Sequence, residues 1–167
     1  MKVVSMIIAA LAAGAASASP AEFLVPGPAA IPAGFRQVFA MFTAEQYAVQ
    51  YDAADDASRL LMSEHTDAAG ASYAEQVATL EQMAGNRHGV IPRRLGQFAF
   101  DGHRGVIYAM AESAVRNNVL LLDDDGKLLR LSAYDGTSHR FGPDDLIGLL
   151  RHFERRAAPA PPSSGRD

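Results

Sequence analysis

The fold is decided by residues 95–134, which read LGQFAFDGHRGVIYAMAESAVRNNVLLLDDDGKLLRLSAY. Near the start of this stretch, Phe98 and Phe100 alternate with small or polar residues, as in a strand with one buried face. Asp101-Gly102 then fits a two-residue hairpin turn, and residues 103–111 run back along the first strand. The beginning of the stretch therefore predicts an antiparallel hairpin.

A second hairpin follows in the same stretch. Residues 119–122 and 128–134 are largely apolar runs of strand length on either side of Asp123-Asp124-Asp125-Gly126. Three carboxylates and a glycine favour a tight, solvated turn, and the run lacks the alternating oxygen ligands and distant glutamate of a calcium loop. We therefore expect the acidic run to be a turn between two strands.

Two helices are predicted outside this stretch. Ser72 and Glu75 fit a capping box, and apolar residues recur at helical spacing until Gly85, which predicts a helix over residues 72–84. Pro143 can begin a second helix because proline suits the first helical position, and the leucines and phenylalanine that follow form an apolar stripe. This pattern predicts a helix over residues 143–154.

The residues before the first helix predict further strands. Residues 35–42 are apolar on both faces, which indicates a strand buried on two sides, and residues 46–51 alternate with the period of a half-buried strand. Residues 58–65 are expected to form a strand that runs back after a turn. The alanine-rich residues 43–57 also fit a helix with its own capping box, so the sequence leaves helix or strand open there.

Hairpins with one inserted helix and one terminal helix predict the α+β class. We expect a single domain in which a twisted antiparallel β-sheet packs against the two helices, over about residues 72–84 and 143–154.

The order of elements also carries a resemblance. A pair of strands precedes the helix GASYAEQVATLEQM (70–83), and a strand then leads to FDGHRGVIYA (100–109). The hairpin LLLDDDGKLLRLSAYDG (120–136) and the segment FGPDDLIGLLRHF (141–153) complete the order. Over about residues 35–154 this resembles the small exported domains of the PsbP-like fold. The resemblance implies a twisted antiparallel sheet flanked by helices and an accessory or binding role, and it assigns no functional residue.

Residues 1–18, MKVVSMIIAALAAGAASA, have the pattern of a cleaved secretory signal peptide. Lys2 precedes an apolar run of about a dozen residues, which is shorter than the roughly 20 that a membrane span needs. Ala16-Ser17-Ala18 offers a signal peptidase its small side chains. We therefore expect cleavage after Ala18, export to the periplasm or out of the cell, and no membrane span in the mature chain. An uncleaved anchor is the alternative.

Composition sets the expected limits of the folded domain. Residues 19–34 contain four prolines, which predicts an extended lead-in without a regular element. Residues 155–167 are rich in proline and serine and poor in bulky apolar residues, which predicts a disordered tail. The α+β domain is therefore expected over residues 35–154.

The composition of the whole chain excludes several functions. The chain has 167 residues, a formal net charge of −4 and no cysteine. A mildly acidic chain has no overall field to attract nucleic acid. Without cysteine there is no disulfide, no thiol nucleophile and no cysteine-bound metal.

Arginine adjoins histidine at several places, and these positions are the candidate binding residues. Guanidinium groups suit bidentate contacts with phosphate or carboxylate, so such residues would hold an anion if the fold brought them together. The alternative is that they are polar residues at the ends of strands. The candidate ligand-binding residues are Arg93, Arg94, His103, Arg104, His139 and Arg140.

The chain has no recognised motif for catalysis, a cofactor or a metal. It lacks a nucleophile elbow, a Walker loop and an H-E-x-x-H helix, and its histidines lack the spacing that places two ligands on one face. We therefore predict no catalytic residue, no cofactor and no metal site. The expected function is a non-enzymatic binding or accessory domain for an envelope protein or a small ligand. The alternatives are a small envelope enzyme that uses histidine and carboxylate groups, and an exported metal-binding protein.

Overall fold

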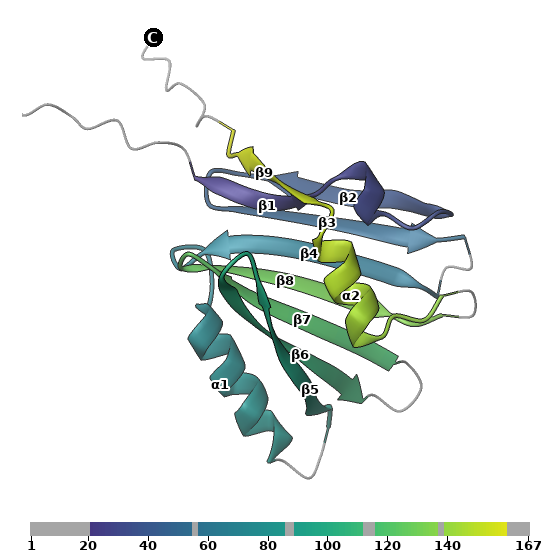
Figure 1. Cartoon of the computed structure of the whole chain (residues 1–167), viewed down its shortest axis with the longest axis vertical. Coiled ribbons are helices and arrows are strands. Elements are labelled where there is room, and N and C mark those ends of the chain that lie inside the picture. The colour runs from purple at the N-terminus through teal and green to yellow at the C-terminus, as the bar shows by residue number, and fades with distance from the viewer. Residues whose placement is uncertain (1–20, 55–56, 86–88, 112–115, 137–138, 160–167) are drawn as a thin grey trace, which may run out of the picture.

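A computed structural model describes residues 21–54, 57–85, 89–111, 116–136 and 139–159 of the chain (Figure 1). The predicted signal peptide, residues 1–18, lies outside the described residues. Most of the described chain forms antiparallel sheet, accompanied by two α-helices, which agrees with the predicted α+β class. The sheet dominates the structure more than the sequence suggested, because both ends of the domain also form strands.

The main sheet has seven strands in the described part of the chain, and every neighbouring pair is antiparallel. Their spatial order is β2-β3-β4-β8-β7-β6-β5. Two runs of sequential hairpins meet where β4 pairs with β8, in a register that extends from Arg59↔Tyr134 to Thr66↔Lys127. The strands are β2 (Phe35–Phe42), β3 (Gln46–Ala53), β4 (Arg59–Thr66), β5 (Ile91–Phe100), β6 (His103–Ala111), β7 (Arg116–Asp124) and β8 (Lys127–Tyr134).

A separate pair of strands lies against one face of this sheet. Strand β1 (Glu22–Pro26) pairs antiparallel with β9 (Phe153–Ala157), and we call the pair the β1–β9 ribbon. The backbone N–H of Ala158 donates to the carbonyl of Ala21 at 2.7 Å, so the two ends of the described chain lie side by side (Figure 1). The ribbon thus joins residues that are far apart in the sequence.

The two faces of the main sheet have separate apolar cores. On the face that carries the ribbon, which we call the ribbon face, Phe23 and Leu24 pack with sheet residues and with Leu146 and Leu150 of helix α2 (Pro143–Leu150). On the opposite face, Leu80 of helix α1 (Tyr73–Ala84) packs against β6, β7 and β8. A single 3₁₀ turn, η1 (Pro28–Ala30), follows β1.

Several local predictions are confirmed. Ser72 caps α1, accepting from the N–H of Glu75 at 3.3 Å and donating its own backbone N–H to the Glu75 carboxylate at 2.9 Å. Residues 46–53 form a strand, which settles the choice that the sequence left open. Asp101-Gly102 turns the β5–β6 hairpin with φ values of 48° and 83°, in the left-handed region that two-residue hairpin turns need.

The predicted ends of the domain were wrong. The helix expected over residues 143–154 ends at Leu150, because Phe153 begins a strand. The lead-in expected over residues 19–34 contains β1 and η1, and the tail expected from residue 155 begins inside β9. The physical reason is the same at both ends: each segment gains backbone hydrogen bonds from the other, and composition does not reveal so distant a partner.

Two further expectations about burial were also wrong. Strand β2, expected to be buried on two sides, lies at the edge of the sheet, where Val38 and Phe39 are 46% and 49% exposed. The acidic run was expected to be a solvated turn, but only Asp125-Gly126 forms the turn, with φ values of 51° and 81°. Asp124 ends β7 and is fully buried because its side chain faces the ribbon.

The turn at Gly126 gives a clean test of backbone strain. A Cβ added at Gly126 meets no atom within 4 Å, so Gly126→Ala acts only through the φ of +81°. We expect a loss of about 1 kcal/mol in unfolding free energy, measured by urea denaturation. Gly96→Ala is the control, because Gly96 also has no neighbour within 4 Å and its φ is not positive. Equal stabilities for the two variants would contradict the assigned turn.

Candidate functional site

Two acidic side chains are fully buried between the ribbon and the main sheet. Glu64 continues the alternation of Leu60 and Met62 along β4, so its side chain points to the ribbon face. Asp124 lies at the end of β7, opposite Lys127 in the hairpin register. Burial of a carboxylate is costly unless it is paired, so the partners of these two residues decide how the site behaves.

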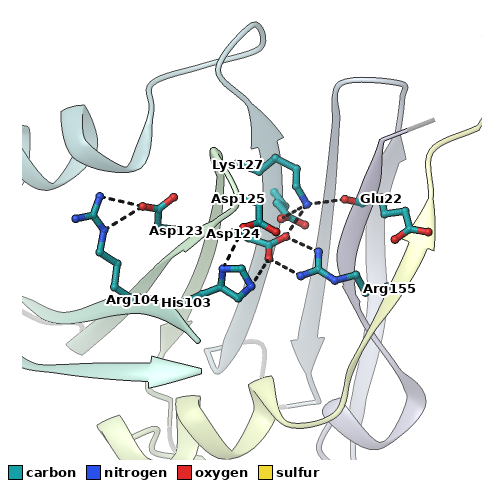
Figure 2. Close-up of polar contacts among 9 residues, drawn as sticks. Glu22, His103, Arg104, Asp123, Asp124, Asp125, Lys127 and Arg155 are labelled. Atoms are coloured by element: carbon teal, nitrogen blue, oxygen red, sulfur yellow. Dashed lines mark hydrogen bonds and ion pairs between the residues drawn. The ribbon is translucent and has the colours of Figure 1, made fainter. Parts of the chain in front are cut away.

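Asp124 is held by two cationic side chains from different elements (Figure 2). The guanidinium of Arg155, on β9, donates two hydrogen bonds to its carboxylate, at 2.7 and 2.6 Å. The ammonium group of Lys127, on β8, donates to Asp124 Oδ2 at 2.5 Å and to the backbone carbonyl of Glu22, on β1, at 2.6 Å. We call Glu64, Asp124, Lys127 and Arg155 the ionic cluster.

Glu64 completes the ionic cluster from β4. Its Oε2 accepts a hydrogen bond from the backbone N–H of Leu24 at 2.5 Å. Its Oε1 lies 3.2 Å from Lys127 Nζ, yet has no hydrogen-bond partner among the described residues. Tyr47 lies beside it and donates its hydroxyl proton to the carbonyl of Leu24 at 2.5 Å. Both backbone polar groups of Leu24 are therefore satisfied by sheet side chains.

The surroundings of the two carboxyl groups drive their pKa values apart. Burial, together with the neighbouring carboxylate of Asp124, raises the pKa of Glu64 from 4.5 to about 8. Burial alone would also raise the pKa of Asp124, but hydrogen bonds from Arg155 and Lys127 outweigh it and hold that pKa well below its usual range. At neutral pH, Glu64 is therefore mainly protonated and Asp124 is ionised.

His103 connects the ionic cluster to the surface. Its Nε2 lies 3.7 Å from Asp124 Oδ1 and its Nδ1 lies 3.7 Å from Asp125 Oδ1. Beside it is an open hollow of about 390 Å³, lined by residues of the two neighbouring hairpin turns. The ligand atoms of His103, Asp124 and Asp125 lie within 4.8 Å of one another, as a metal site requires. Asp124 is already bound by Arg155 and Lys127, however, and their positive charges oppose a metal cation there.

The six candidate binding residues do not converge on one patch. His103 contacts the ionic cluster, and Arg104 beside it pairs with Asp123 at 3.0 Å and lies over the ring of Tyr73. Arg94 pairs with Glu81 of α1 at 3.2 Å. These contacts give three of the candidates a role in joining elements of the fold.

The other candidates lie at two further places. The ring of His139 stacks on Phe141 and meets Phe35 edge to face, so it contributes to packing. Arg140 lines an open hollow beside α2. Arg93 lines a larger hollow over β5, β6 and β7, and it is the candidate whose surroundings most resemble a binding site.

We call this feature the arginine hollow, and its volume is about 580 Å³. The sheet register places Arg93, Ala109 and Asn118 side by side across three strands of the ribbon face. Arg116 lies on the same face, two residues before Asn118 on β7. The small side chain of Ala109 between longer ones leaves the space open. The hollow is lined by Ile91, Arg93, Leu95, Ala109, Met110, Arg116, Asn117 and Asn118.

The charges of the arginine hollow are unbalanced. Within the described residues, the guanidinium groups of Arg93 and Arg116 have no hydrogen bond or ion pair, and no carboxylate lines the hollow. Asn118 is held by a hydrogen bond from its Nδ2 to the carbonyl of Phe141 at 2.5 Å, whereas Oδ1 of Asn117 is buried without a partner in the described chain. Because side chains alternate along β7, Asn117 lies on the face opposite Arg116 and Asn118. Within the described residues, the hollow therefore offers two unpaired cations beside apolar side chains.

Several of these residues were missed by the sequence analysis. Glu64 left a readable signal, since a charged residue continues an alternating apolar pattern on the inward face of β4. Arg116 and Arg155 gave no local signal, because their importance depends on strands that are distant in sequence. Asp124 was missed because it belongs to the run of acidic residues and glycine that predicted a solvated turn.

Comparison with known proteins assigns no relatives. No family model matches the chain, and no curated protein matches it either. None of the helices in the described residues is long and apolar enough to cross a membrane. The function must therefore be argued from the site geometry.

The pKa of Glu64 predicts how stability depends on pH. Between pH 4.5 and about 8 the folded state keeps a proton that the unfolded state has lost. The unfolding free energy should therefore fall as pH rises through this range, by up to about 1.4 kcal/mol per pH unit. Glu64→Gln, which cannot titrate, should flatten this slope in urea denaturation measured at several pH values.

Glu45→Gln is the matched control, because Glu45 is exposed and lies outside the cluster. It should keep the slope of the wild-type protein. Equal slopes for Glu64→Gln and the wild type between pH 5 and about 8 would contradict the assigned protonation of Glu64.

Proposed function

We propose that this protein is an exported, non-enzymatic binding domain that holds a small anionic ligand with an apolar body in the arginine hollow. The observation that carries the proposal is a pair of guanidinium groups, Arg93 and Arg116, that have no partner among the described residues and lie beside apolar side chains in a hollow that no described carboxylate lines. Its volume of about 580 Å³ is within the usual range of small-molecule sites.

The chemistry of the lining selects the ligand class. A guanidinium group binds phosphate or carboxylate through two parallel hydrogen bonds. Ile91 and Leu95 offer apolar contacts to the rest of the ligand.

The ionic cluster favours binding over catalysis. A catalytic acid or base must reach the substrate, whereas Glu64 and Asp124 are fully buried beneath the ribbon. Three hydrogen bonds from Arg155 and Lys127 hold Asp124, so it is not free to accept a substrate proton. An accessory or binding role also agrees with the PsbP-like order of elements.

Export is supported by the signal-peptide pattern of residues 1–18. Expression of the full chain in a bacterium, followed by N-terminal sequencing of the cell fractions, tests this part. We expect a mature chain that begins at Ser19 in the periplasm or the medium. Ala18→Arg should block cleavage, because signal peptidase requires a small residue there. A wild-type chain that keeps Met1 and stays in the cytoplasm would refute export.

Ligand binding is tested with octyl phosphate as the probe, titrated by calorimetry. We expect saturable binding that weakens about tenfold for each of Arg93→Gln and Arg116→Gln, as for the loss of a hydrogen bond to a charged group. Octanol, which lacks the anion, should bind more weakly than octyl phosphate.

Arg140→Gln is the matched control, because it removes the same charge from an arginine that also has no hydrogen bond or ion pair within the described residues but lies in another hollow. It should leave the affinity unchanged. Equal weakening by Arg140→Gln and Arg93→Gln would show a nonspecific charge effect and refute the site.

A further inference from the structure

The two edges of the main sheet differ in how they are protected. Strand β5, at one edge, contains Pro92, which has no N–H to donate, and two arginines follow it. Its register with β6 is also interrupted between Arg94 and Gly96. Proline, exposed charge and a bulge each prevent an edge from pairing with another strand. The β5 edge is therefore closed to further strands.

Strand β2, at the other edge, is much less protected. The described residues have three exposed large apolar side chains, and two of them, Val38 and Phe39, lie on β2. Residues 38–42, VFAMF, contain no charge and no proline. Although the β2–β3 register shifts at Val38, it is continuous from Phe39 to Phe42. An apolar edge of this kind is a template for another strand.

We propose that β2 pairs antiparallel with β2 of a second copy of this chain, about a two-fold axis near Ala40. This register places Phe39 opposite Met41 and Val38 opposite Phe42, so each contact is apolar. The only charged residue of β2, Arg36, lies outside the paired segment. Like charges therefore do not face one another, which makes the segment complementary to itself.

The asymmetry of the two edges sets the size of the assembly. A two-fold contact uses the same edge of both copies, so both β2 edges are covered in the dimer and neither can bind a third chain. Because β5 is protected, growth stops at the dimer and does not continue into a fibre. The pairing joins two seven-stranded sheets and leaves the arginine hollows, over β5 to β7, at the far ends.

A hollow beside β2 offers further apolar surface to the proposed β2–β2 contact. Phe39, Ala48, Gln50 and Leu61 line a space of about 400 Å³ on the face opposite the ribbon. The register pairs Phe39 with Gln50 and Met41 with Ala48, which places Met41 on that same face. Met41 of the second copy would thus lie beside Phe39 at the border of the hollow, where apolar area is available for burial.

The oligomeric state tests the proposal. Sedimentation velocity of the purified protein should give twice the mass of the chain present, where all 167 residues together have a mass of 17.8 kDa. Replacement of both Val38 and Phe39 by lysine should give monomers, because the side chains are exposed in the single chain and the dimer would place each lysine against an apolar residue of the second copy. Ile91→Lys is the control: it alters the third exposed apolar side chain, on β5, and should leave the dimer intact.

A cross-link then tests the register. The chain contains no cysteine, so Ala40→Cys introduces a single thiol beside the proposed axis. Mild oxidation should convert it to a disulfide-linked dimer, because directly opposite residues lie within disulfide range. Ala99→Cys, an exposed position on β5, should remain mainly monomeric.

Two results would overturn the proposal: a monomeric wild-type protein at high concentration, or a dimer that persists when Val38 and Phe39 are both lysine. Equal cross-linking of Ala40→Cys and Ala99→Cys would exclude the β2 register. These outcomes are independent of ligand binding, since the arginine hollow lies at the opposite edge of the sheet.

Discussion

The bidentate pair between Asp124 and Arg155 is the contact on which the rest of the structure depends. Asp124 is fully buried at the end of β7, and Arg155 reaches it from β9, close to the end of the described chain. A buried carboxylate without a cation would cost several kcal/mol, of order 3–5 when one partner is removed. The sheet and the ribbon are therefore tied together, because Asp124 has both of its cationic partners, Lys127 and Arg155, only when the last strand is in place.

The ribbon also completes the core of its face. Phe23, Leu24 and Val25 are buried against the sheet, and Glu64 and Tyr47 satisfy the backbone of Leu24 from below. Without cysteine, no disulfide holds these terminal strands. Apolar burial and a small number of charge-assisted hydrogen bonds hold the terminal strands on the sheet. The neutral state of Glu64 reduces the charge that is buried in the core.

The pairing of charges separates structural residues from candidate binding residues. Arg94, Arg104 and Arg155 each have a carboxylate partner and join elements of the fold. Arg93 and Arg116 have none among the described residues, although the chain is acidic overall. An arginine without a partner beside apolar side chains keeps its capacity to bind an oxyanion, which is why the arginine hollow, and not the ionic cluster, is the proposed ligand site.

Short-range patterns in the sequence were sufficient to predict the Ser72-capped helix, the Asp101-Gly102 turn and the antiparallel hairpins, since each depends on residues a few positions apart. The β1–β9 pairing, the burial of Asp124 and the exposed position of β2 were decided by tertiary structure alone. Composition indicated a loose lead-in and tail because neither segment can bury its surface by itself. Each becomes a strand only beside the other, since hydrogen bonds and burial depend on partners that the fold brings together from opposite ends of the chain.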